Sequence, residues 1–248
     1  MKTGIKKPSW KRVVLIGSIV VVAAAITIYV LASVQAWNTA ISSTAQASSD
    51  LKQSVDSKLA TETPPASVPV AIDEILKSYN DTLSQGPCQL PPLFEWQSNL
   101  PWLKDNRQAC LTTAQAADEL ASSLTDMQVF YKQDAAAAVL VKQATEGTAS
   151  TTDYTAAAAT WQKVADDKSL ITDDAFKPVG AKVIEVSGAI AAAYTSLAAA
   201  NSKEDKAAFD AAQKALGEAY ARLAEIQTTS TEAQAVLVDS VVEAYDNV

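Results

Sequence analysis

The 248-residue chain contains no histidine and only seven glycines. Without histidine it has no Ser-His-Asp triad, no Cys-His dyad, no histidine general base and no histidine-ligated metal. Phosphate-binding loops need closely spaced glycines, and the sequence has neither a Gly-rich loop nor a Walker lysine. These absences exclude many enzyme classes. We therefore predict a protein that is not an enzyme and binds no cofactor.

Acidic residues are missing from positions 1–12, which hold five of the 20 basic residues. The rest of the chain holds the other 15 basic residues and all 28 acidic ones, a net charge of −13. An acidic domain of this kind is repelled by phosphate backbones, so we do not expect nucleic acid as a partner.

Charge is also absent from residues 13–34, which read VVLIGSIVVVAAAITIYVLASV. A helix of this length extends about 33 Å, close to the thickness of a hydrocarbon core. Because the basic residues lie only on its N-terminal side, the positive-inside rule keeps that side in the cytoplasm. We predict a cytoplasmic basic tail at 1–12, a single-pass anchor at 13–34 in contact with membrane lipid, and an extracytoplasmic remainder. Trp10, Tyr29 and Trp37 are expected at the membrane–water interfaces.

A cleaved signal peptide is the alternative to an uncleaved anchor. Val34-Gln35-Ala36 resembles a small-residue cleavage site, although the apolar run exceeds the 7–15 residues usual for a signal peptide. Both alternatives export the rest of the chain. A core helix is disfavoured by the one-sided charge of the flanks.

Cys88 and Cys110 are the only cysteines. In an exported domain two thiols are expected to form a disulfide, and without histidine they make a poor zinc site. The segment between them contains three prolines and many large apolar residues, and it is the least helix-like part of the sequence. It is either a lid on one end of the domain or a presented binding surface, whose candidate partner-binding residues are Leu93, Phe94, Trp96 and Trp102.

The remaining sequence predicts an all-α fold, because it is rich in alanine and poor in glycine. Residues 35–69 are expected to form a helical stalk that ends in a Pro-rich linker at Pro64, Pro65 and Pro69. Residues 70–248 are expected to form an antiparallel bundle of four to five helices with one disulfide-closed loop.

Apolar residues at three- and four-residue spacing mark the helices of this bundle. The expected ranges are 70–84, about 105–146, a helix to about 167, a helix opened by Pro178, and a long final helix. Ser150–Asp153 and Ser202–Asp205 resemble capping boxes. The final helix carries a nearly strict heptad pattern through Phe209, Leu216, Leu223, Ser230, Leu237 and Ala244, so coiled-coil-like packing is expected.

Carboxylates are the remaining candidates for catalysis, and most of them are expected to act as solvated or helix-capping groups. Glu95 lies between two aromatic residues, but glycoside hydrolysis needs a second carboxylate across a cleft. The other candidates are the pairs Asp118/Glu119, Asp166/Asp167 and Asp173/Asp174. We do not expect any of them to bind a metal.

The sequence therefore favours a membrane-anchored helical interaction or assembly protein of the cell envelope, bound to a protein partner or to further copies of itself. One alternative is a ligand-binding sensory ectodomain that signals through a partner subunit, because no second membrane span precedes Val248. A carboxylate-based envelope hydrolase is the weaker alternative.

Overall fold

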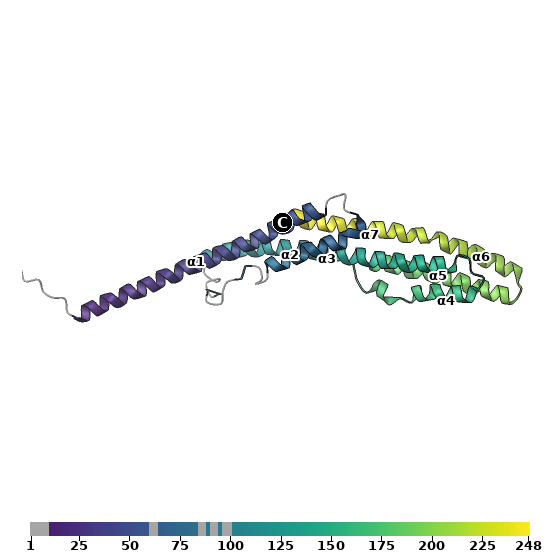
Figure 1. The fold of residues 1–248 in the computed structure, drawn as a ribbon, viewed down its shortest axis with the longest axis horizontal. Helices are drawn as coiled ribbons and strands as arrows, with labels where there is room; N and C mark the ends of the chain where they lie inside the picture. The colour runs from purple at the N-terminus through teal and green to yellow at the C-terminus, as the bar shows by residue number, and fades with distance from the viewer. Residues whose placement is uncertain (1–9, 60–63, 84–87, 90–93, 96–100) are drawn as a thin grey trace, which may run out of the picture. The chain divides into compact units, whose positions relative to one another are not determined.

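The computed structural model describes residues 10–59, 64–83, 88–89, 94–95 and 101–248; the side chains of residues 10–24, 65, 101 and 102 lie outside this description. Helix is the only regular secondary structure among the described residues, with no strand among them. In chain order the elements are α1 (Trp10–Lys58), η1 (Pro65–Ser67), α2 (Val68–Thr82), α3 (Pro101–Thr148), α4 (Tyr154–Ala165), η3 (Lys168–Ile171), α5 (Lys177–Ser202), α6 (Lys206–Ala221) and α7 (Leu223–Asn247). Figure 1 shows these helices along the chain. The predicted all-α helical bundle is confirmed.

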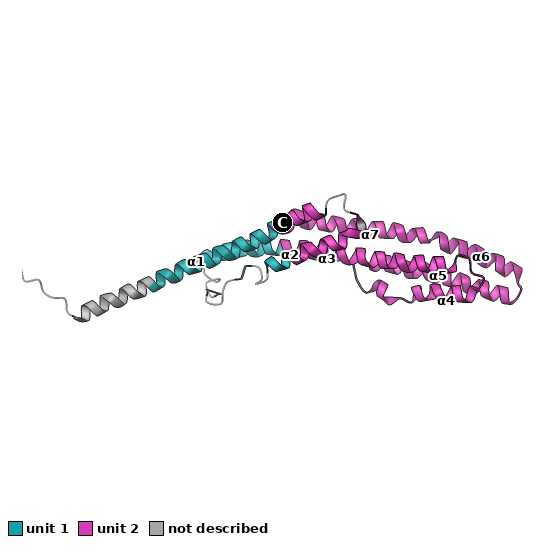
Figure 2. Ribbon diagram, in the orientation of Figure 1, with its two compact units in different colours: residues 1–49, 80–115 teal, residues 50–79, 116–248 magenta. Residues whose placement is uncertain are grey.

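The chain divides into two compact units (Figure 2). Unit 1 comprises residues 1–49 and 80–115, and unit 2 comprises residues 50–79 and 116–248. Helices α1 and α3 each contribute to both units. The predicted stalk is therefore divided, with residues 35–49 in unit 1 and residues 50–69 in unit 2.

Helix α5 forms the core of unit 2, where it packs against α4, η3, α6 and α7. Its stripe of Val179, Val183, Val186, Ile190 and Leu197 is almost fully buried. Among the residues searched, α5 alone is long and apolar enough to span a membrane, and half of its apolar stretch is buried in the protein. Its apolarity is that of a core helix, because the burial comes from neighbouring helices.

Contacts between side chains show that neighbouring helices of unit 2 run antiparallel. Along α3 and α7, hydrogen bonds pair Ser123 with Ser240 and Asp134 with Ser230, so ascending positions on one helix meet descending positions on the other. Along α4 and α5, Tyr154 stacks on Tyr194, whereas Ala165 lies beside Gly188. The predicted antiparallel packing is thus present within unit 2.

Gly180 permits a close approach between α5 and η3 in this core. A Cβ atom at this position would lie 1.7 Å from the carbonyl oxygen of Leu170, so only glycine lets α5 meet η3 at this distance. Pro178 lies in the first turn of α5, as predicted, where its missing N–H costs no hydrogen bond.

The heptad pattern predicted one long final helix, and this prediction is wrong in one respect. The helix is interrupted at Arg222, which separates α6 from α7. The backbone N–H of Arg222 approaches the carbonyl oxygens of both Glu218 and Ala219, which tightens the turn there. The predicted caps also begin three residues later than expected. Asp153 and Asp205, rather than Ser150 and Ser202, cap α4 and α6 by accepting hydrogen bonds from backbone amides.

Candidate functional site

The disulfide of unit 1 is the first part of the candidate site, and it confirms the prediction for Cys88 and Cys110. The two Cα atoms lie 6.0 Å apart, and both residues are buried. Cys88 has a positive φ of 55°, a backbone conformation that non-glycine residues adopt only where the surroundings hold it. The disulfide therefore belongs to the interior of unit 1.

Helix α1 supplies the surface on which this disulfide rests. The backbone N–H of Cys88 donates a hydrogen bond of 3.1 Å to Thr44 Oγ1, and that hydroxyl donates to the carbonyl oxygen of Ala40. Ile41 packs against the two cysteines and Ala114. Cys88 and the part of α3 around Cys110 and Ala114 are thereby fixed against residues 40–44 of α1.

The four predicted partner-binding residues differ in how far the structure describes them. Phe94 is buried, with its ring centroid 5.2 Å from that of Tyr29 on α1. Leu93 and Trp96 lie outside the described residues. Trp102 belongs to the first turn of α3, although its side chain is not described. The role of these residues in partner binding stays a prediction.

Helix α3 begins earlier than predicted, at Pro101 instead of about residue 105. The C-terminal part of the inter-cysteine segment is therefore helical, which corrects the expectation that this segment avoids helix. Proline is favoured in the first turn of a helix, where its fixed φ suits the helix and no N–H is needed. The proline that looked like a helix breaker therefore starts α3.

The exposed surface of α1 changes character at the end of the predicted anchor. Five large apolar residues before this point are 49–69% exposed: Ile26, Ile28, Val30, Leu31 and Val34. After it, the exposed residues are polar apart from Ala45, and they include Gln35, Asn38 and Thr39. Trp37 is only 3% exposed, so its side chain lies in the interior of unit 1, and its predicted place at a membrane interface stays a prediction. The helical face that carries Ser33 and Trp37 is the face that unit 1 covers.

The candidate carboxylates of the catalytic alternative serve local structural contacts. Asp118 accepts a hydrogen bond from the hydroxyl of Tyr79, and burial together with this contact raises the pKa of Tyr79. The pairs at 166–167 and 173–174 cap helical turns, accept backbone amides or pair with a lysine. Glu95 is exposed. No cluster of metal-ligating side chains occurs among the residues described.

Unit 2 contains a half-open pocket of about 240 Å³ between α3, α5 and α7. Its floor includes the buried side chains of Val179 and Val183. Asp134, which interrupts the apolar stripe of α3, lines the pocket and accepts a 2.9 Å hydrogen bond from Ser230. The pocket thus combines an apolar floor with a carboxylate at its edge.

A buried polar network joins α3, α4, α5 and α6 at one end of this unit. Thr148 Oγ1 accepts a hydrogen bond from the indole N–H of Trp161 at 3.1 Å and lies 3.0 Å from the hydroxyl of Tyr220. The hydroxyl of Tyr194 donates to the carbonyl oxygen of Thr148 and lies 3.0 Å from that of Tyr220. Burial, and then the contact with Tyr220, raise the pKa of Tyr194 to about 12. The network satisfies polar groups that would otherwise be costly to bury.

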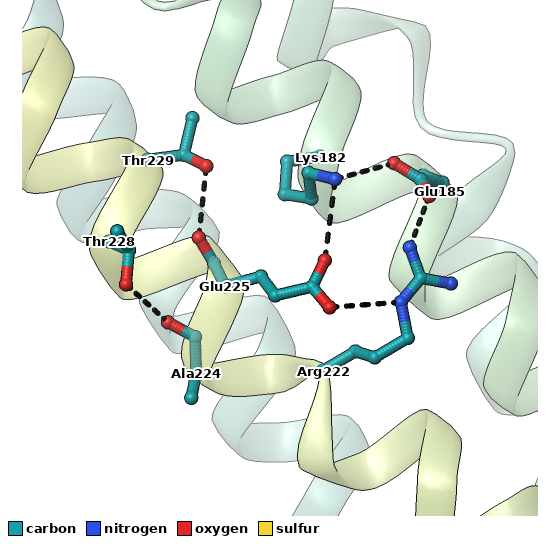
Figure 3. A network of polar contacts seen from close by, with 7 residues as sticks. All are labelled: Lys182, Glu185, Arg222, Ala224, Glu225, Thr228 and Thr229. Carbon is teal, nitrogen blue, oxygen red and sulfur yellow. Dashed lines mark hydrogen bonds and ion pairs between the residues drawn. The ribbon is translucent and has the colours of Figure 1, made fainter.

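Four charged side chains surround the break between α6 and α7 (Figure 3). Lys182 on α5 donates to Glu185 at 2.8 Å and lies 3.4 Å from Glu225, while Arg222 pairs with both carboxylates. The hydrogen bond from Lys182 lowers the pKa of Glu185, and the one from Arg222 lowers that of Glu225. These exposed pairs join α5 to the start of α7, a feature that the heptad pattern did not indicate.

Comparisons of the chain with protein-family models, with curated proteins and with solved structures found no match, so function is inferred from the chain's own residues.

Proposed function

We propose that the chain is a membrane-tethered helical protein of the cell envelope whose bundle lies outside the cytoplasm and acts by binding, without catalytic chemistry. The observation that carries the tether is the set of exposed apolar side chains on α1 from Ile26 to Val34. Exposing such a surface to water is unfavourable, with a free-energy cost of about 25 cal/mol per Å² of apolar area. The basic residues at 1–12 orient the tether with its N-terminus in the cytoplasm.

An uncleaved anchor is favoured over a signal peptide by the packing of unit 1. Tyr29 contacts Phe94, and Ser33 is 5% exposed. Both residues precede Ala36, so cleavage after this residue would remove part of the interior of unit 1. α1 also continues through this position without a break.

The tether is tested by extracting membranes that contain the full chain with alkaline carbonate and, separately, with detergent. The proposal requires that the protein stay with the membrane in carbonate, dissolve in detergent, and have the intact mass of the uncleaved chain. Release by carbonate, or a mass that begins near Trp37, would contradict it. Disrupting the anchor with Val30→Lys and Leu31→Lys should release the protein; Gln35→Lys and Asn38→Lys, just beyond it, serve as the matched control.

Binding to a protein partner is supported by two features of the surface. The disulfide restricts the segment that carries the predicted residues, so that less conformational entropy is lost on binding. On α7, Val238 and Val242 are exposed one turn apart, together with Val236. A protein partner, or a second copy of the chain, is therefore the proposed binding target.

Cross-linking in intact cells tests this binding with the double variant Trp96→Ala/Trp102→Ala. Binding through the inter-cysteine segment predicts loss of the cross-linked species while helicity stays unchanged. The variant Val238→Ala/Val242→Ala shortens the exposed valines of α7 and tests this second surface in the same way. Unchanged cross-linking in the tryptophan variant would exclude this segment as the binding site, and loss in the valine variant would move it to α7.

A ligand-binding sensory domain is the second candidate, because the pocket between α3, α5 and α7 offers a specific place for a small molecule. Its lining combines an apolar floor with the carboxylate of Asp134 and the amine of Lys142, which suits a small amphipathic zwitterion. Thermal stabilisation of the full chain by such compounds, lost in Asp134→Asn, would support this candidate. Stabilisation that Asp134→Asn leaves unchanged would contradict it.

A further inference from the structure

Helix α7 carries a second row of residues at heptad spacing, on the side that faces away from its bundle. Its inner row packs into unit 2 and includes the buried residues Ser230, Val241 and Ala244. The outer row advances by four and three residues in turn, and all of its members are exposed: Ala224, Thr228, Thr231, Ala235, Val238 and Val242. We call this row the outer seam; at 1.5 Å per residue it is about 27 Å long. Two helices of a coiled coil pack along rows with this spacing.

Acidic side chains follow one edge of the outer seam. They recur every seven residues, and all are exposed: Glu225, Glu232, Asp239 and Asp246. With the seam at the a and d positions of a heptad, these carboxylates occupy the e positions. Glu225 pairs with Lys182 and Arg222 (Figure 3), whereas the other three form no ion pair with any described residue. α7 itself contains no lysine or arginine, so it does not neutralise this edge.

The opposite edge of the outer seam is closed by the bundle. Gln234 donates a 2.6 Å hydrogen bond to the hydroxyl of Tyr131 on α3, and Val241 is buried. Near the end of α7, the hydroxyl of Tyr245 donates to Asp56. α7 is thereby held with its seam outward, and a helix placed on the seam meets the carboxylates at the open edge.

Charge determines which helix this surface fits. Residues at e and g positions face residues of the partner helix, and opposite charges there set the choice of partner. In an antiparallel pair of α7 helices the carboxylates would face one another, which is repulsive. In a parallel pair they would face Gln227, Gln234 and Val241, none of which carries a charge. A helix with basic residues neutralises the edge, and a second copy of the chain does not.

We infer that the outer seam of α7 binds a helix of a partner protein that carries apolar residues at heptad spacing and lysine or arginine beside them. This inference rests on the proposed function, because it names a binding surface for the proposed protein partner. Val238 and Val242 supply the apolar contact, and the small side chains of the seam let the two backbones approach closely. Glu232 and Asp239 pair with the basic residues of the partner.

Binding of two synthetic peptides to the full chain tests this inference. Each peptide is a helix of three heptads with leucine and alanine at the a and d positions; one has lysine at every e and g position, and the other has glutamate there. The chain is placed in nanodiscs of phosphatidylcholine, and binding is measured by fluorescence anisotropy, with empty nanodiscs as the blank. The basic peptide should bind at least about tenfold more tightly than the acidic one.

Reversing charges separates binding at the seam from general attraction to an acidic protein. Glu232→Lys/Asp239→Lys should weaken binding of the basic peptide at least about tenfold and strengthen binding of the acidic one, because the facing pairs change sign. Asp81→Lys/Asp210→Lys is the matched control, because these residues are exposed on α2 and α6 and the net charge changes equally. Equal weakening in the two variants would overturn the inference.

The apolar contact is tested without a change of charge by Val238→Ser/Val242→Ser. This variant should weaken binding of the basic peptide about tenfold. Val70→Ser/Val139→Ser, at exposed valines of α2 and α3, should leave it unchanged. Circular dichroism verifies that helicity is the same in every variant. Equal affinity of the two valine variants would overturn the inference.

Two further outcomes would also overturn it. If the chain alone forms cross-linked dimers that Val238→Ser/Val242→Ser abolishes, a second copy occupies the seam. If the unmodified chain does not bind the basic peptide, the seam does not recognise a basic helix. Neither outcome removes the proposed function, because cross-linking in cells reports separately whether the chain binds a protein.

Discussion

Replacing Gly180 with alanine should destabilise unit 2 by a predictable amount. The added Cβ would lie 1.7 Å from the carbonyl oxygen of Leu170 and 2.6 Å from its carbonyl carbon. Ordinary contacts begin near 3.4 Å, so α5 and η3 must separate by about 1.5–2 Å. The obstructing atoms are backbone, which cannot move aside as a flexible side chain does. Overpacking of this kind costs about 1–3 kcal/mol.

The assay is thermal unfolding of the full chain in detergent, followed by circular dichroism at the helix band. For a chain of this size, 1 kcal/mol corresponds to roughly 2–4 °C, so Gly180→Ala should lower the Tm by about 2–12 °C. Gly217→Ala is the matched control, because Gly217 lies within α6 with nothing within 4 Å of an added Cβ. Alanine should stabilise that helix by about 0.5–1 kcal/mol. A Tm of Gly180→Ala at or above that of the unmodified chain would refute the close approach of α5 and η3.

Three further predictions concern contacts within each of the two units. Thr148→Val should lower the free energy of unfolding by about 1–3 kcal/mol, because the indole N–H of Trp161 loses its acceptor. Thr148→Ser keeps a hydroxyl and should lower it far less. Equal Tm values for the two variants would contradict the network. The double variant Cys88→Ser/Cys110→Ser should lose about 3 kcal/mol of stability in urea unfolding, because the closed loop restricts the unfolded chain, and an unchanged urea midpoint would argue against that contribution. Because the pKa of Glu225 is lower in the folded protein than its unfolded value of 4.5, the ionised carboxylate stabilises the fold above pH 4.5, and this stability is lost as the pH falls through the folded pKa. Glu225→Gln lacks this contribution, so its Tm should decrease less on acidification than the Tm of the unmodified chain. An equally large decrease in both proteins would exclude the contribution.

The sequence was sufficient to predict features set by local chemistry. The spacing of apolar residues predicted α5 as a core helix, and Pro178 predicted the start of that helix. The cysteine count predicted the disulfide, because two cysteines offer only one pairing within the chain. Each of these features depends on residues close in sequence or on a single choice of partner.

Features set by contacts between distant residues were not predictable. Gly180 is one of seven glycines, and only the position of Leu170 shows why it matters. The break at Arg222 lies inside an uninterrupted heptad pattern, so the sequence around it gives no sign of it. The charged residues of α5 that contact this region are about 40 positions away in sequence. The burial of Trp37 was likewise not predictable, because the position of this residue next to the apolar run does not show which parts of unit 1 pack around it.

The most direct test of the proposed tether and orientation is the accessibility of two introduced cysteines in intact cells. Ser196→Cys places a thiol on the exposed side of α5, and Ser9→Cys places one in the basic tail; the native cysteines are bonded to each other. A membrane-impermeant thiol reagent should label position 196 in intact cells and position 9 only after lysis, with both proteins in the carbonate-resistant membrane fraction. Labelling of position 196 only after lysis would contradict an extracytoplasmic bundle, and release of both proteins by carbonate would contradict the tether.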